Sequence, residues 1–170
     1  MQNTITRKLA RAGVIAALYV SLSLLVLPVA SGAIQFRISE ALCVLPLIYA
    51  EAIPALAVGC IISNLITGCA AYDVIFGSII TLAAAAATYG IGKTPFGKFF
   101  KISVGGLFPV FLNAFLLPVI WYFCYGELEY VYMLQVLFLI ISQSAAVYFI
   151  GSLCYLGLFK MRQKGVLFLQ

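Results

Sequence analysis

Two charged residues, Arg37 and Glu40, stand three positions apart in an otherwise apolar stretch of the chain. On one helical turn they can pair with each other, which requires no ligand. A charge in an apolar setting nevertheless costs on the order of 2–3 kcal/mol unless it gains a partner. A bound solute would be such a partner. The two residues are therefore candidates both for an ion pair and for a substrate-binding site.

A second acid, Asp73, also has two interpretations. It can cap a helix by accepting a hydrogen bond from the backbone N–H group of Ile75 or Phe76, or it can face a ligand. The acids Glu127 and Glu129 are instead typical of a solvated loop. Asp73 therefore joins the candidate site, and the two glutamates do not.

Three amides fall near the middle or the ends of apolar segments, namely Asn64, Asn113 and Gln143. In a membrane such groups either tie helices together, for about 0.6 kcal/mol each, or bind a solute. Aromatic side chains near the segment ends favour an interfacial belt. These aromatic residues are Trp121, Tyr122, Tyr130 and Tyr132.

Several kinds of chemistry are excluded by what the sequence lacks. The chain has no histidine, and its five cysteines form no CxxC pair, which argues against a metal site and against Ser/His/Asp or Cys/His catalysis. It has no GxxxxGK[ST] phosphate loop for ATP hydrolysis. No basic stripe interleaves with aromatic residues, as nucleic-acid binding requires. We expect neither an enzyme nor a cofactor.

The composition is that of a protein embedded in a membrane. Hydrophobic residues make up 65% of the chain and charged residues 9%, whereas about a quarter of an ordinary soluble domain is charged. Because about twenty apolar residues span a bilayer, the chain has room for five or six spans. We expect one all-α domain over residues 1–170 with six transmembrane helices, over about 12–30, 39–49, 51–67, 73–89, 102–124 and 130–159.

Two of these helices have special features. The first begins after basic residues and ends near ASGA, as a signal peptide would, but its length and the five spans that follow favour a helix. The second is short, with Ser39 as its N-cap and the irregular GAIQFRI segment before it. Unpaired backbone is tolerated at membrane depth only around a cavity, so this segment predicts a cavity-lining loop.

The basic residues predict the orientation of the chain. Nine of the ten Lys and Arg residues fall in three groups on one side of the predicted spans, and only Arg37 falls on the other. Cytoplasmic loops carry an excess of such residues, so both termini are expected in the cytoplasm. The groups are Arg7, Lys8 and Arg11, then Lys93, Lys98 and Lys101, then Lys160, Arg162 and Lys164.

A stripe of small residues marks the first helix. Ala12 and Ala16 stand four positions apart, and Gly13 and Ala17 form the adjacent row. Small residues at this spacing let another helix approach closely. The stripe predicts either packing inside the bundle or docking to a partner subunit.

Two segments carry a family resemblance. FRISEALCVLPLIYAEAIPALAVGCIISNL, followed by YDVIFGSIITLAAA, resembles the QueT family of queuosine-precursor binding subunits of energy-coupling-factor transporters. The family pattern has proline before EAIP and glycine after it, where this chain has Ala50 and Ala55. The resemblance implies a six-helix substrate-binding component in a bacterial plasma membrane. It also implies that Ala12xxxAla16 docks onto a transmembrane coupling subunit that two ATPases drive.

The resemblance further implies a 7-deazaguanine base as the solute. One carboxylate can accept both donors on the edge of such a base, and Glu40 is the first choice for this role. The ring carbonyl would need a donor such as Asn64, Asn113 or Gln143. A flat base would stack on Tyr72 or Trp121, and Asp73 could pair with an aminomethyl cation.

Three other functions stay open on the sequence. A binding component for another vitamin would share the fold but not the pocket. A self-sufficient secondary transporter for a small polar solute would need ionisable residues at mid-membrane depth in both halves of a repeat, and no internal repeat is clear. A purely structural membrane subunit would explain the small-residue stripe but not the FRISE segment.

Overall fold

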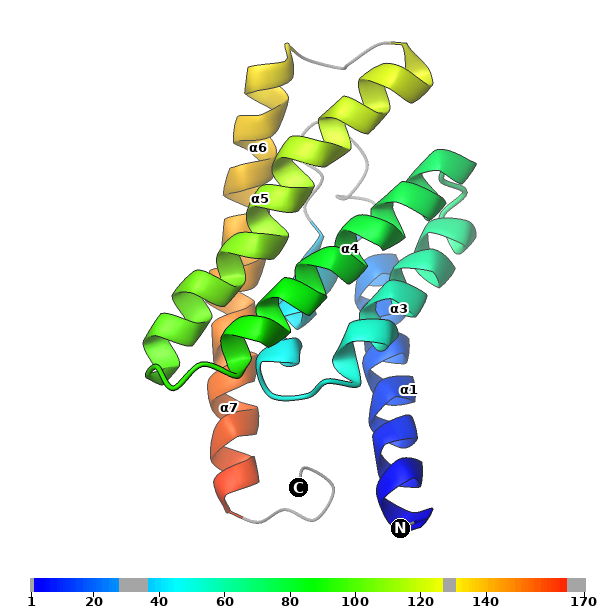
Figure 1. Cartoon of the computed structure of the whole chain (residues 1–170). Coiled ribbons are helices and arrows are strands. Elements are labelled where there is room, and N and C mark those ends of the chain that lie inside the picture. Colours follow the sequence, from blue (N-terminus) through cyan, green and yellow to red (C-terminus); the bar gives the residue numbers. More distant parts are fainter. Residues whose placement is uncertain (1, 28–36, 127–130, 165–170) are drawn as a thin grey trace.

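The computed structural model describes residues 2–27, 37–126 and 131–164, and every secondary-structure element in these ranges is helical (Figure 1). This confirms the all-α expectation. The elements are α1 (Gln2–Leu25), η1 (Ile38–Leu47), α3 (Ala52–Ile66), α4 (Ala71–Gly92), α5 (Lys98–Tyr125), α6 (Tyr132–Ser144), η2 (Ala145–Gly151) and α7 (Ser152–Gln163).

Four helical stretches are long and apolar enough to cross a membrane. They cover Ile5–Leu25, Ala71–Gly92, Lys98–Cys124 and the continuous rod Tyr132–Gln163. The remaining two helices, η1 and α3, are apolar but shorter. The chain is therefore a multi-pass membrane protein. In Figure 1, α1 begins and α7 ends at the same end of the molecule, which we call the terminal end.

The first helix begins much earlier than predicted. It starts at Gln2 rather than Ala12, so Arg7, Lys8 and Arg11 belong to the helix instead of preceding it. The physical reason is that lysine, arginine and leucine are good helix formers, and no proline or glycine interrupts the run before Gly13. The predicted end at Ala30 lies outside the described residues.

The second helix differs in type. Residues Ile38–Leu47 form a 3-10 helix, and the residue before it, Arg37, takes an extended conformation as the N-cap. The prediction that Ser39 is the N-cap is wrong, because Ser39 lies inside the helix and is buried. Pro46 removes one backbone donor from this element. Such helices seldom exceed three or four residues, so surrounding helices must hold this one in place.

The other helices follow the predicted pattern with shifted ends. The chain turns sharply after α3 at Gly68, which has φ +73°, and α4 starts at Ala71 rather than Asp73. α5 starts four residues before the predicted Ile102. The predicted last helix is a rod of α6, η2 and α7, in which η2 is a π-helix. Its predicted start at Tyr130 lies outside the described residues.

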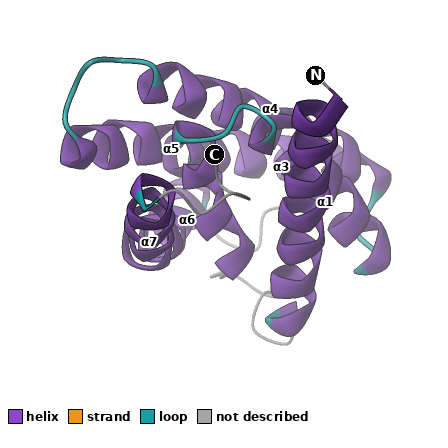
Figure 2. Ribbon diagram, turned by 90° about the horizontal axis from the view of Figure 1, so that it is seen from below, coloured by secondary structure: helices purple, strands orange, loops and turns teal. Residues whose placement is uncertain are grey.

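η1 lies at the centre of the bundle. It contacts α1, α3, α4, α5, η2 and α7 (Figures 1 and 2). Two glycines let neighbouring helices close over it. A Cβ atom on Gly151 would lie 2.7 Å from the Ala41 carbonyl oxygen, and one on Gly92 would lie 2.6 Å from the Leu47 carbonyl oxygen. Only a residue without a side chain permits such backbone contacts.

A proline within α5 is compensated by its neighbour. Pro109 has no N–H group, so it cannot bond the carbonyl of Gly105 four residues earlier. The Thr88 hydroxyl of α4 donates to that carbonyl at 2.9 Å. A polar backbone group freed in an apolar bundle is thereby satisfied, and α4 is joined to α5.

We expect Gly151→Ala to destabilise the protein. Its new methyl group would press on the backbone of η1, and overpacking of this kind costs about 1–3 kcal/mol. Gly157→Ala is the matched control, because a Cβ there meets nothing within 4 Å. Thermal unfolding of the two purified variants in detergent measures the difference. Equal melting temperatures would show that η1 yields to the methyl group.

Candidate binding site

The Glu40 carboxylate is buried, at 1% exposure, and is hydrogen-bonded on both oxygens. Oε1 accepts from the Tyr19 hydroxyl at 2.8 Å. Oε2 accepts from the Cys43 thiol at 3.1 Å and from the Asn113 amide nitrogen at 3.3 Å. Arg37 is not among these donors in the described part of the chain, although it lies within electrostatic range. Simple pairing of Arg37 with Glu40 is therefore not what holds this carboxylate.

Local structure explains how these donors converge. In a 3-10 helix the side chains of residues three apart lie above one another, so Cys43 reaches Glu40 within η1. Tyr19 comes from the buried face of α1. Asn113 comes from α5, between the two prolines of that helix. The carboxylate thus joins three elements at the centre of the bundle.

A pocket of about 210 Å³ lies between the helix ends opposite the terminal end. Most of its polar groups come from Arg37 and from the ends of α1, α3, α4 and α5. The described residues bring a guanidinium, a carboxylate and an indole to it. The lining residues include Tyr19, Ser23, Arg37, Ser63, Asn64, Thr67, Asp73 and Trp121. Four predicted site residues, Arg37, Asn64, Asp73 and Trp121, therefore meet at one pocket.

Asp73 anchors the wall of this pocket. The indole N–H of Trp121 donates to its Oδ1 at 2.8 Å, and the Asn64 amide donates to its backbone carbonyl at 3.2 Å. The alternative in which Asp73 is the N-cap is wrong. Ala70 occupies that position, and Asp73 lies in the first turn of α4, where a carboxylate is favoured by the helix dipole.

The other predicted site residues do not line the pocket. Glu40 and Asn113 lie behind Tyr19, which both lines the pocket and bonds Glu40. Gln143 is buried at 2% exposure, and its amide oxygen accepts no hydrogen bond from the described residues. Tyr72 is 52% exposed on α4. Ligand contacts at all eight positions stay predictions.

Sequence reasoning missed Tyr19, Ser63 and Thr67. The hydroxyls of Ser63 and Thr67 donate to backbone carbonyls of α3. Ser63 bonds the Cys60 carbonyl at 3.1 Å, and Thr67 bonds the Ser63 carbonyl at 2.9 Å. One signal could have found Tyr19. It is a phenol within the apolar run of α1, four positions after the buried Ile15, and a buried phenol needs a hydrogen-bond partner.

The small-residue stripe of α1 divides into two rows. Ala12 and Ala16 are partly buried against the core, and a Cβ on Gly59 of α3 would lie 3.2 Å from the Ala16 carbonyl oxygen. Gly13 and Ala17 face outward, and a Cβ on Gly13 would meet nothing within 4 Å. The first row therefore packs inside the bundle, while the second leaves a smooth outer face.

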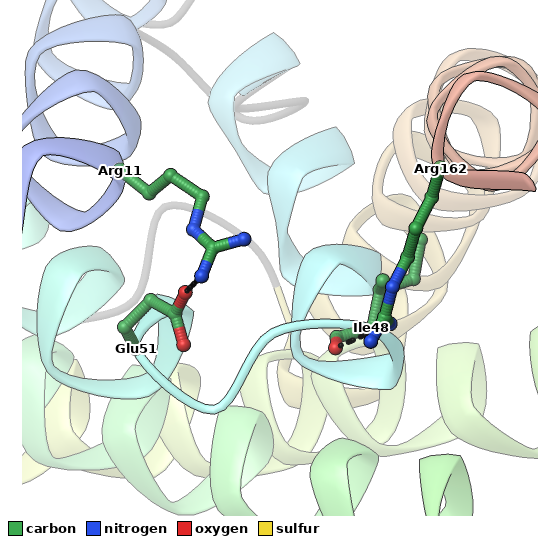
Figure 3. A network of polar contacts seen from close by, with 4 residues as sticks. All are labelled: Arg11, Ile48, Glu51 and Arg162. Carbon is green, nitrogen blue, oxygen red and sulfur yellow. Dashed lines mark hydrogen bonds and ion pairs between the residues drawn. The ribbon is translucent and has the colours of Figure 1, made fainter. Parts of the chain in front are cut away.

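A second polar cluster lies at the terminal end (Figure 3). Arg11 of α1 and Glu51 form an ion pair of 2.7 Å in which both side chains are largely buried. The Arg11 guanidinium also lies over the Tyr49 ring, 4.7 Å from its centroid. From α7, Arg162 donates to the Ile48 carbonyl at 3.4 Å. Glu51 is the first residue of the helix predicted over 51–67, and no ion pair was predicted for it.

Long apolar helices that enclose a polar pocket define a membrane protein of the solute-binding or transport class. The sequence matches the family model of the QueT transporter over residues 9–160. The chain belongs to the QueT transporter family, which confirms the resemblance seen in its sequence. No curated protein and no solved structure matches the chain.

We expect Tyr19→Phe to lower the free energy of unfolding by about 1–2 kcal/mol, because Glu40 loses one buried hydrogen bond. Tyr122→Phe is the control, since that side chain is 55% exposed. Thermal unfolding measures both. The Tyr19→Phe loss should shrink in a Glu40→Gln background, and an undiminished loss would mean that Tyr19 stabilises the protein through other contacts.

Proposed function

We propose that this chain is the substrate-binding component of an energy-coupling-factor importer and captures a queuosine precursor, a 7-deazaguanine base. The observation that supports this best is the pocket where Arg37, Asp73 and Trp121 meet in front of the buried Glu40. Membership in the QueT transporter family supports the transport role.

The pocket chemistry suits such a base. Its edge carries a ring N–H and an amino group beside a carbonyl, and an aminomethyl form adds a cation. The Asp73 carboxylate can accept from the donors or pair with the cation, and the Arg37 guanidinium can donate to the carbonyl. The Trp121 indole, held by Asp73, supplies a flat apolar surface.

Glu40 takes a different part in this proposal from the one the sequence suggested. Three donors already occupy its oxygens, and it does not line the pocket. Glu40 would accept from the base directly only if Tyr19, which lines the pocket in front of it, turned aside. We therefore propose that Asp73 contacts the base directly. The role of Glu40 is to hold the Tyr19 side chain in place.

The proposed topology has six spans with both termini in the cytoplasm. Four spans are the long helices, and η1 with α3 supplies the two shorter ones. Nine basic residues then lie on the cytoplasmic side, as orientation rules favour, and the pocket faces outward. In a bacterial plasma membrane, the pocket would take its solute from outside the cell.

Energy would come from partners, because the sequence carries no phosphate-binding loop. A transmembrane coupling subunit and two ATPases fill this role in the proposal. Docking would use the outward row of α1, Gly13 and Ala17, flanked by Ala12 and Ala16. An ion-coupled transporter is disfavoured, since α3, α5, α6 and α7 contain no aspartate or glutamate.

Ligand binding tests the function. Pre-queuosine bases at a hundredfold excess over their dissociation constant should stabilise the purified protein by about 2.7 kcal/mol, which a thermal shift detects. Riboflavin, thiamine and biotin are the comparison solutes. Stabilisation by one of these in place of the bases would assign the protein to another vitamin, and stabilisation by none would contradict the proposal.

Variants test the residue roles. Asp73→Asn and Arg37→Gln should each weaken base binding at least tenfold, since a hydrogen bond to a charged group contributes about 1.5–3 kcal/mol. Trp121→Ala should weaken it, whereas Tyr72→Ala at an exposed position should do so only if the base stacks there. Lys160→Gln, at the terminal end, is the control. Unchanged affinity in both Asp73→Asn and Glu40→Gln would refute the assignment.

Docking is tested by co-purification of the coupling subunit. Gly13→Trp and Ala17→Trp should reduce the recovered subunit about tenfold, because both project from the outer face of α1 without disturbing its packing on α3. Ala12→Trp and Ala16→Trp would also disturb the core and are less informative. Leu25→Trp is the control, at a residue that is 75% exposed. Full recovery with both Gly13 and Ala17 variants would remove α1 from docking.

A further inference from the structure

An apolar groove of about 280 Å³ runs between α1 and α7. Its floor is η1 and the turn after it, and its walls come from the two helices, which stand apart in Figures 1 and 2. Val14 and Leu18 on the α1 wall are about half exposed, at 48% and 47%. The principal apolar lining residues are Val14, Leu18, Leu42, Leu45, Cys154 and Leu158.

A basic pocket of about 320 Å³ lies at the terminal end of the same region. Lys8 of α1, Lys93 at the end of α4 and Arg162 of α7 bring three positive charges to it. No aspartate or glutamate is among the described residues that line it. The nearby Glu51 pairs with Arg11 instead. The charge of the basic pocket is thus uncompensated by its own walls.

The groove and the basic pocket are neighbours. Tyr49 lines the groove, and the centroid of its ring lies 4.7 Å from the Arg11 guanidinium and 5.7 Å from that of Arg162. Arg162 also donates to the Ile48 carbonyl, which holds the guanidinium against the turn after η1 (Figure 3). A single elongated molecule could therefore occupy both spaces, with an apolar part in one and an anionic part in the other.

We propose that the groove and the basic pocket together form a binding site for an anionic phospholipid. An acyl chain would lie along η1 between α1 and α7, and the phosphate would lie among Lys8, Lys93 and Arg162. Basic pockets between transmembrane helices recognise anionic lipid head groups in this way. This site is distinct from the polar pocket of Arg37, Asp73 and Trp121, which lies at the opposite end of the molecule.

The two adjoining chemistries favour a lipid over other occupants. A free phosphate would use the three cations but leave the groove unfilled. A hydrophobic helix of a partner protein would cover the groove but bring no anion to the basic pocket. Only an amphiphile with one negative head group matches both, and anionic lipids of this kind give the cytoplasmic leaflet of cell membranes its negative surface potential.

Native mass spectrometry of the full-length protein tests the proposal, with phosphatidylglycerol, phosphatidylcholine and glycerol phosphate as probes. Phosphatidylglycerol should bind most tightly. Lys8→Gln with Lys93→Gln should weaken it about 25-fold, or about fivefold for each cation removed. The control pair, Lys160→Gln with Lys164→Gln, removes the same charge outside the basic pocket and should leave the affinity unchanged.

A second pair of variants tests the groove. Cys154→Phe fills it from α7 and should lower the affinity for phosphatidylglycerol, while Leu153→Phe, at a residue 71% exposed and outside the groove, should not. Equal losses in both charge pairs, equal binding of phosphatidylcholine, or equally tight glycerol phosphate would each overturn the proposal. The proposal would also be overturned if Cys154→Phe kept its lipid affinity but no longer co-purified with the coupling subunit. That result would make the groove a protein-docking surface.

Discussion

A buried carboxylate is the constraint on which this structure depends. Glu40 lies on a short helix at the centre of an apolar bundle, where an unsatisfied oxygen would be strongly unfavourable. Donors must therefore reach it from α1, from α5 and from its own turn. The 3-10 geometry of η1 supplies the nearest of them, and glycines in α4 and η2 let the bundle close around that geometry.

This arrangement separates the two ends of the molecule. On one side of η1, Tyr19 bonds Glu40 and also lines a pocket that contains both positive and negative charge. On the other, the charged groups that the described residues bring near the turn after η1 are cations and one buried ion pair. The two regions therefore differ in charge balance, because Arg37 shares the polar pocket with Asp73, whereas Lys8, Lys93 and Arg162 give the basic pocket an excess of positive charge.

The all-helical fold and several pocket residues could be predicted from the sequence. The helix ends, the type of η1 and the side-chain partners could not, for physical reasons. Apolar segment length indicates where helices lie, but their ends shift where good helix formers continue the run, as before Ala12. The type of η1 could not be predicted, because its neighbours impose it. Of the two interpretations of Asp73, the cap is wrong because Ala70 holds the N-cap position, while ligand contact stays a prediction for a residue that lines the pocket. The partner of Tyr19 and the pairing of Arg11 with Glu51 depend on helix packing, which local patterns do not encode.

The position of Tyr19 on α1 has a consequence for how two binding events affect each other. The same rigid helix carries the phenol that bonds Glu40 and, less than two turns away, the outward Gly13 and Ala17. If a partner shifts α1 when it binds, Tyr19 moves as well. A solute that favours one position of α1 must then change the affinity for the partner. By thermodynamic linkage, the partner changes the affinity for the solute by the same factor.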